Sequence, residues 1–178
     1  MNFKIKNSEI KFRGKVFDLR VDEIVYNSGN EGIREVAVHP GGAVAVAIKE
    51  NGNVILVKQY RYPLDKSSIE LPAGKLEKNE DPMHCAIREL EEEAGYKAGK
   101  IEKLGSIYTT PGFCTEELHI YLAKDLEEGN HNREEGEFGM QILEYSLDEI
   151  EEKIKTGEIK DSKTICGIYM YKNKSVQK

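Results

Sequence analysis

Four glutamates occupy five consecutive positions in the segment "ELEEEAGY", residues 89–96. Like charges spaced four residues apart on a helix repel one another. Glu89 and Glu93, the pair with that spacing, must therefore be protonated or share a cation if they lie close together. A hard divalent cation such as Mg²⁺ is a suitable partner, because it binds through a small number of carboxylate oxygens.

The residues around these glutamates predict a helix over residues 82–94. Asp81 is a good N-cap, Pro82 suits the first helical position, and Gly95 is a natural stop. Apolar residues recur at helical spacing and form one stripe, which comprises Met83, Ala86, Ile87, Leu90 and Ala94. The glutamates therefore belong to an amphipathic helix.

The helical period indicates where each carboxylate lies relative to this stripe. With Leu90 at its centre, Glu93 lies about 60° away and Glu89 about 100° away on the same side. We expect both to be half-buried at the edge of the apolar face. Glu92 lies farther round, near Arg88, which could neutralise it. The plainer alternative for the whole segment is a solvated, charged helix face.

The fixed positions of this segment resemble the Nudix box of the Nudix hydrolases. The matching residues are Gly74, Glu80, Arg88, Glu89, Glu92, Glu93 and Gly95, at the spacing of that box. Tyr96 stands where a bulky aliphatic residue is usual, and its ring preserves the bulk. The resemblance implies an α/β protein with a Nudix-type α/β/α sandwich, in which the box forms a loop, a helix and a second loop.

The resemblance also implies a site for Mg²⁺ or Mn²⁺. In the family, the residues that match Glu89 and Glu93 bind the metal, and the one that matches Glu92 often helps. The carbonyl before the box glycine, here that of Ala73, is a ligand in many members. Arg88 typically orients the glutamates.

Segments outside the box are similar to the ADP-ribose pyrophosphatase group of the family. Pro111 follows Tyr96 by 15 residues, and "VKQYRYP" and "IELPAGKLE" lie upstream. The resemblance implies hydrolysis of ADP-ribose, a small nucleotide-sugar substrate, to AMP and ribose 5-phosphate. It also implies a homodimer that exchanges a small N-terminal antiparallel β subdomain, residues 1–40, beside a Nudix hydrolase domain, residues 41–178.

Three residues are candidates for substrate contact. Arg61 at a strand end could make a bidentate contact with a diphosphate, or it could be a surface residue that pairs with Asp65. Glu70 could touch the adenine or bond the loop backbone. Pro111 marks the loop that the resemblance places at the substrate, where Tyr108 and Phe113 could stack on a base or belong to the core.

A hydrolase also needs a base to accept a proton from the attacking water. In the ADP-ribose group this base, or another metal contact, is a glutamate in a mobile loop before the last strand. The corresponding segment here is "NREEGEFG". We choose Glu137 and then Glu135, and a solvated acidic loop is the alternative.

The composition narrows the class of protein further. A net charge of −6 disfavours a nucleic-acid or anionic-membrane binder. Three cysteines without a C-x-x-C pair predict no disulfide framework, and no signal peptide or membrane helix is expected. These features favour a cytoplasmic protein.

The pattern of the whole chain predicts strands around the central helix, with two more helices after them. The expected strands include 43–48, 54–57, 101–108, 117–123 and 140–145, and the expected later helices are 147–155 and 162–172. Two alternatives to ADP-ribose hydrolysis remain: a pyrophosphatase for other nucleoside diphosphate sugars, and a non-catalytic ADP-ribose sensor.

Overall fold

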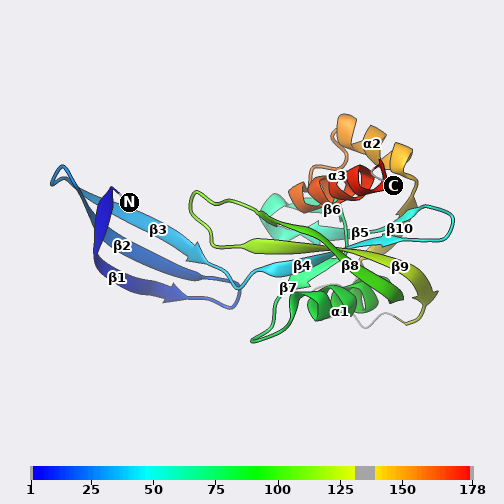
Figure 1. The fold of residues 1–178 in the computed structure, drawn as a ribbon, viewed down its shortest axis with the longest axis horizontal. Coiled ribbons are helices and arrows are strands. Elements are labelled where there is room, and N and C mark those ends of the chain that lie inside the picture. The colour runs from blue at the N-terminus through cyan, green and yellow to red at the C-terminus, as the bar shows by residue number, and fades with distance from the viewer. Residues whose placement is uncertain (1, 131–138, 177–178) are drawn as a thin grey trace. The chain divides into compact units, whose positions relative to one another are not determined.

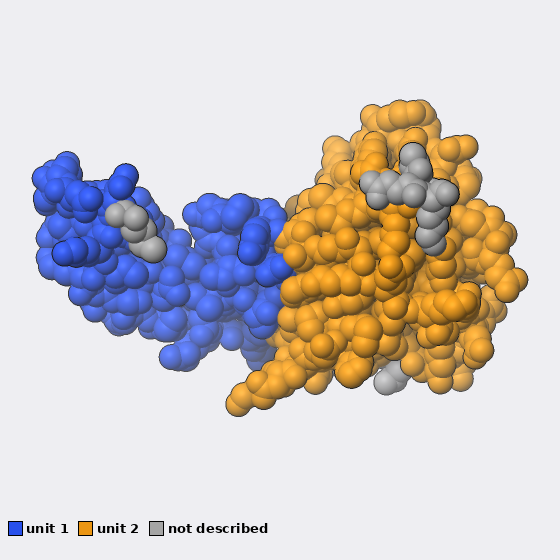
Figure 2. All heavy atoms as spheres, in the orientation of Figure 1, with its two compact units in different colours: residues 1–41, 108–117 blue, residues 42–107, 118–178 orange. Residues whose placement is uncertain are grey.

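The computed structural model describes residues 2–130 and 139–176. The chain divides into two compact units, which Figure 2 colours separately. The first unit comprises Met1–Gly41 and Tyr108–Glu117, and the second comprises Gly42–Ile107 and Leu118–Lys178.

The first unit contains an antiparallel sheet of three strands in the order β1-β2-β3. Their bounds are β1, Phe3–Arg13; β2, Asp18–Tyr26; and β3, Glu31–Val38. Gly29 turns the chain between β2 and β3 with a φ of 88°, a left-handed conformation that favours glycine. The segment Tyr108–Glu117 attaches to the end of β3, since Phe113 O accepts a 2.8 Å hydrogen bond from Ala37 N.

The second unit is built on a mixed sheet of seven strands (Figure 1). Its path runs β10-β5-β4-β9-β8, with β6 paired to β5 and β7 paired to β4. The bounds are β4, Gly42–Ile48; β5, Val54–Arg61; β6, Lys66–Glu70; β7, Ala73–Lys75; β8, Tyr96–Tyr108; β9, Glu117–Glu128; and β10, Gln141–Tyr145. A short 3₁₀ turn, η1, spans Tyr62–Leu64.

Helices cover both faces of this sheet. Helix α1, Pro82–Ala94, lies on one face, and α2, Leu147–Lys155, and α3, Ser162–Val176, lie on the other (Figure 1). These layers confirm the predicted α/β/α sandwich. No helix in the described part of the chain is long and apolar enough to cross a membrane.

Strand β4 shows how one strand serves both faces. Successive side chains of a strand point to opposite sides. Val44 and Val46 join the core cluster that α2 and α3 cover, whereas Ala43 and Ala45 pack on the α1 side. The small alanines allow α1 to lie close to the sheet, and this brings its side chains against β7.

The predicted elements are correct in kind, but several of them are longer than expected. β5 continues to Arg61, β8 begins at Tyr96, β9 continues to Glu128, and α3 continues to Val176. β8 lies at the edge of the sheet and exposes most of its side chains, so its first half lacks the apolar alternation that identifies a strand. Residues 124–128, which lie beyond the predicted strand 117–123, are the end of β9.

Candidate functional site

Helix α1 begins and ends at the predicted residues. The Asp81 side chain accepts a 2.8 Å hydrogen bond from Met83 N, which makes it the N-cap. Gly95 has a φ of 73° and its N–H bonds the last carbonyls of the helix. Both caps fix the register of the glutamates between them.

The buried face of α1 is rotated relative to the prediction. Glu93 and Glu89 are only 3% and 8% exposed, so they are buried and not half-buried. Cys85 is also buried, whereas Met83 and Ile87 of the predicted stripe are only partly buried. The face is therefore centred near Glu93, because the alanines of β4 and the backbone of β7 receive that side of the helix.

The backbone of β7 lies directly against both buried carboxylates. A Cβ atom at Gly74 would lie 1.8 Å from Glu89 Oε1, so any side chain there would displace Glu89. Ala73 N donates a 3.0 Å hydrogen bond to Glu93 Oε2. The glycine is thus needed for close approach, and β7 positions the two carboxylates.

Arg88 joins three carboxylates of the box. Its Nη1 donates to Glu89 Oε1 at 2.7 Å and to Glu92 Oε2 at 2.9 Å. Its Nε and Nη2 donate to the two oxygens of Glu80 at 2.9 and 3.1 Å. Hydrogen bonds to Glu80, Glu92 and Glu89, together with the charge of Glu89, raise the pKa of Arg88. The predicted neutralisation of Glu92 by Arg88 is confirmed.

We call Glu80, Arg88, Glu89, Glu92 and Glu93 the Arg88 cluster. It holds four carboxylates and one guanidinium, a formal charge of −3. In the described part of the chain, no three His, Cys, Asp or Glu side chains are grouped so as to hold a metal ion by themselves. Mg²⁺ commonly binds one or two carboxylates and completes its shell with water and phosphate oxygens. The oxygen-only donors of the cluster and its negative charge fit such a cation.

A second cluster of charges surrounds Glu70, which is 2% exposed. Arg61 makes a bidentate contact with it, from Nε to Oε1 at 2.9 Å and from Nη2 to Oε2 at 2.6 Å. Lys163 Nζ contacts the same carboxylate and pairs with Asp161 Oδ1 at 3.0 Å. We call Arg61, Glu70, Asp161 and Lys163 the Glu70 cluster, and its formal charge is zero.

The pKa values of the Glu70 cluster follow from these contacts. Burial would raise the pKa of Glu70, but Arg61 and Lys163 outweigh it and lower the pKa to about 2. The hydrogen bond to Glu70 raises the pKa of Arg61, and the charges of Glu93 and Asp161 add to the effect. The guanidinium of Arg61 therefore lies within electrostatic reach of Glu93 in the Arg88 cluster.

Two of the alternative interpretations, one for Arg61 and one for Glu70, are wrong. Arg61 does not pair with Asp65, whose carboxylate accepts a 2.7 Å hydrogen bond from the Tyr60 hydroxyl. Glu70 bonds side chains and not the loop backbone. Thr164 instead bonds the backbone of the loop, since its Oγ1 accepts a 2.8 Å hydrogen bond from Leu71 N.

Comparison with known proteins identifies the box. A family model of the NUDIX domain matches residues 38–166, which is more than half of the chain. The chain belongs to the NUDIX family.

Relatives of this NUDIX chain match it over most of their length. An ADP-ribose pyrophosphatase of Bacillus subtilis (strain 168) is 42% identical over 159 residues, which cover 88% of this chain and 85% of that protein. A methanol dehydrogenase activator of Bacillus methanolicus is 44% identical over 166 residues, 92% of this chain and 89% of that protein. The solved structure of an ADP compounds hydrolase matches with a TM-score of 0.85, covers 97% of this chain and 94% of its own, and at 17% identity shows the fold.

The remaining candidate residues of the NUDIX chain lie outside these clusters. Pro111 is exposed in a turn of the first unit, closed by a 3.0 Å hydrogen bond from Cys114 N to Thr110 O. Tyr108 and Phe113 are exposed, which excludes the core alternative for them. Glu135 and Glu137, the candidate bases, lie outside the described residues.

Lys163 and Asp161 are members of the site region that sequence reasoning missed. Lys163 lies 93 residues after Glu70, so no local spacing connects them. Asp161 has a signal of its own, because its carboxylate accepts from Thr164 N at 2.9 Å at the start of α3, and an Asp before a helix is a common N-cap. That signal identifies a helix start and not a partner of Lys163.

Proposed function

We propose that this NUDIX hydrolase cleaves the diphosphate of ADP-ribose to give AMP and ribose 5-phosphate. The observation that carries the proposal is the burial of Glu89 and Glu93 together against β7, in a cluster with excess negative charge. Two carboxylates are retained in such a place when a cation is bound there. The ADP-ribose pyrophosphatase of Bacillus subtilis, 42% identical, supports the choice of substrate.

Each residue has a distinct part in this reaction. Glu89, Glu92 and Glu93, with the Ala73 carbonyl, would hold Mg²⁺ or Mn²⁺. A cation held there would supply positive charge against the charge that develops on the diphosphate and would lower the pKa of the attacking water. Arg88 keeps Glu89 and Glu92 in position through its hydrogen bonds at 2.7 and 2.9 Å.

Arg61 and the loop glutamates complete the proposed mechanism. Glu70 occupies Nε and Nη2 of Arg61, which leaves Nη1 to donate to a phosphate oxygen. Glu137 accepts the proton of the attacking water, and Glu135 is the second choice. Glu70 therefore acts by positioning Arg61, because its side chain is too buried to contact the adenine directly.

We also propose a homodimer in which residues 1–40 are exchanged between subunits and Pro111 lines the substrate site. The first unit exposes large apolar side chains, which are Ile5, Phe12, Val16, Phe17, Ile33, Tyr108 and Phe113. Exposed apolar surface of this kind is typical of an interface. The mass in solution tests the proposal, and Ile33→Lys should shift it toward the monomer.

The three cysteines, Cys85, Cys114 and Cys166, are free thiols. Burial and the charges of Glu80 and Glu89 raise the pKa of the Cys85 thiol to about 12, so it remains protonated and unreactive. These thiols support a reducing compartment such as the cytoplasm.

The deciding experiment measures the release of the matching nucleoside monophosphate with Mg²⁺ from ADP-ribose, ADP-glucose, GDP-mannose and an oxidised nucleoside triphosphate. Glu93→Gln keeps the size of the side chain and an acceptor for Ala73 N but removes the charge. Glu91→Gln is the matched control, because Glu91 lies on the outer side of α1 and pairs with Lys97 at 3.4 Å. We expect release from ADP-ribose to fall at least about 100-fold in Glu93→Gln and to be unchanged in Glu91→Gln.

The other outcomes identify the alternatives. Preference for a different sugar would retain the mechanism and change the substrate. Tight binding of ADP-ribose without turnover by the wild type would instead indicate a sensor.

A further inference from the structure

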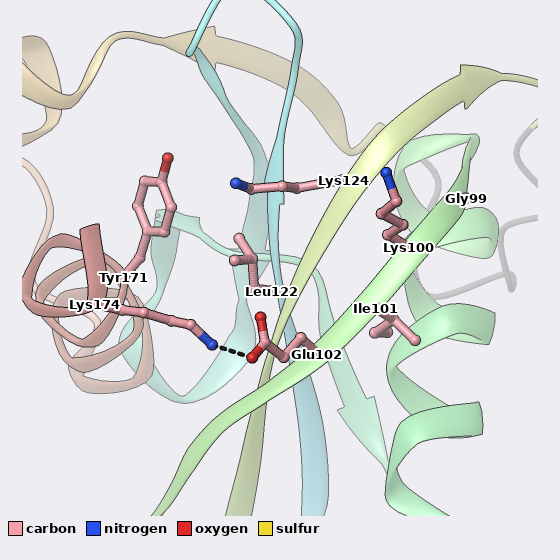
Figure 3. A pocket seen from close by; sticks show the side chains of 8 residues that line it. All are labelled: Gly99, Lys100, Ile101, Glu102, Leu122, Lys124, Tyr171 and Lys174. Atoms are coloured by element: carbon pink, nitrogen blue, oxygen red, sulfur yellow. Dashed lines mark ion pairs between the residues drawn. The ribbon is translucent and has the colours of Figure 1, made fainter. Parts of the chain in front are cut away.

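A hollow of about 820 Å³ lies between α3 and the strands β8 and β9, away from the residues of both charged clusters. Its lining residues are Gly99, Lys100, Ile101, Glu102, Leu122, Lys124, Tyr171 and Lys174. Tyr171 and Lys174 come from α3, and Leu122 and Lys124 come from β9, on the other side of the opening (Figure 3). A volume of this size is within the range of small-molecule sites.

The lining carries positive charge on a protein that is negative as a whole. Three lysines face a single glutamate in it, whereas the net charge of the chain is −6. Lys174 pairs with Glu102 across one side of the hollow (Figure 3). Lys100 pairs with Asp125 at 2.7 Å. Lys124 has no ion pair or hydrogen bond within the described residues, so its ammonium is available to an anion.

The hollow also has an apolar side. Leu122, which is 5% exposed, forms its floor, and the ring of Tyr171 forms the wall opposite Lys124 (Figure 3). An aromatic face offers stacking to a flat ring, and a lysine ammonium binds phosphate as a point charge. The two kinds of contact lie within one opening, which matches a ligand that carries both a ring and a phosphate.

We propose that this hollow binds a nucleoside monophosphate, with the phosphate at Lys124 and the base against Tyr171. The site is separate from the Arg88 cluster. Leu122 belongs to the core cluster that α2 and α3 cover, whereas Glu89 and Glu93 lie on the α1 side of the sheet. The inference goes beyond the proposed reaction and does not depend on it.

The test locates binding by the backbone amide shifts of ¹⁵N-labelled protein in a chelator that removes divalent cations. AMP, adenosine, ribose 5-phosphate and inorganic phosphate are titrated separately. We expect AMP to shift the amides of residues 100–102, 122–124 and 171–174. Adenosine lacks the phosphate and the other two lack the base, so each should bind there about tenfold more weakly or worse.

Matched variants assign the contacts. Lys124→Glu should weaken AMP binding at the hollow at least about tenfold, because it replaces a charge-assisted contact with repulsion. Lys103→Glu makes the same charge change on β8 at a residue that does not line the hollow, and it should bind AMP as the wild type does. Tyr171→Leu should weaken AMP binding and leave the weak phosphate binding unchanged.

Three results would overturn the inference. AMP shifts confined to the amides around Glu89 and Arg61 would mean that it binds only at the proposed reaction site. Phosphate that binds as tightly as AMP would mean an unselective patch of lysines, and equal effects of Lys124→Glu and Lys103→Glu would mean general electrostatics. None of these results bears on ADP-ribose hydrolysis, which the turnover assay tests separately.

Discussion

The Arg88 cluster and the Glu70 cluster are both built from carboxylates and basic side chains but differ in charge balance. The Arg88 cluster places four carboxylates around one guanidinium, whereas the Glu70 cluster pairs two carboxylates with two cations. Both contain carboxylates that are less than 9% exposed. A buried charge is tolerated when it is paired. The first cluster has a formal charge of −3, whereas the second is neutral.

The difference in charge suggests different roles for the two clusters: the first binds a cation, and the second holds Arg61 and α3 in place. In the proposed reaction a cation from outside completes the Arg88 cluster, and its residues would therefore respond to metal and substrate. The Glu70 cluster is neutral within the chain, and it anchors Arg61 to the start of α3 through Lys163. We expect changes in the first to alter metal binding and turnover, whereas loss of Lys163 from the second should alter mainly stability.

Removing a cation from the Glu70 cluster should have the largest effect on stability. Lys163→Met keeps much of the side-chain volume but leaves Glu70 with Arg61 alone. Breaking a buried ion pair in this way should lower the free energy of unfolding by about 3 kcal/mol at neutral pH. Urea unfolding at pH 7 measures the change.

Lys160→Met is the control for Lys163→Met, because Lys160 is exposed in the same loop region. Its free energy of unfolding should stay within about 0.5 kcal/mol of the wild type. Equal values for the two variants would show that Lys163 does not stabilise Glu70, and the comparison of the clusters would fail.

Added metal should have the next largest effect, and only through the Arg88 cluster. At free Mg²⁺ about 100-fold above its Kd, the free energy of unfolding should rise by about 2.7 kcal/mol. Glu93→Gln should lose this rise, and Glu91→Gln should keep it. Lys163→Met should also keep it, although its starting stability is lower. A rise of the same size in Glu93→Gln would place the cation elsewhere.

The two clusters also differ in how far sequence could predict them. Gly74, Glu80, Arg88 and Glu93 lie in one continuous strand, loop and helix, where spacing and caps determine which side chains meet. The rotation of the buried face toward Glu93 could not be predicted, because it depends on the alanines that β4 presents to α1. Lys163 meets Glu70 across 93 residues, and only the packing of α3 on the sheet brings them together.

Gly74 tests whether the backbone of β7 positions Glu89. In Gly74→Ala the new Cβ would lie 1.8 Å from Glu89 Oε1, and Arg88 holds that carboxylate in place. We expect a loss of about 2 kcal/mol in the free energy of unfolding and a fall of about 10- to 100-fold in ADP-ribose turnover. Gly105→Ala is the control, because a Cβ there meets only the flexible end of the Met170 side chain, at 3.4 Å. Full activity in Gly74→Ala would mean that Glu89 can move without consequence.

The smallest effect on stability is expected at Glu144, whose low pKa should correspond to only a small stabilisation. Hydrogen bonds from Asn51 and Asn53, at 2.9 Å each, and from Lys49 lower the pKa of Glu144 from 4.5 to about 2, close to that of Glu70. A carboxylate with a lowered pKa stabilises the fold above pH 4.5, and this contribution is lost as the pH falls toward 2. Because the Glu144 side chain is 33% exposed, its share should be only about 0.5 kcal/mol and should shrink further in 1 M salt. Urea unfolding of Glu144→Gln and Glu70→Gln at pH 6 and pH 3 measures both contributions. The loss of unfolding free energy relative to the wild type should shrink between pH 6 and pH 3, and more so for Glu70→Gln. A larger change for Glu144→Gln would show that burial does not determine how much each carboxylate stabilises the fold.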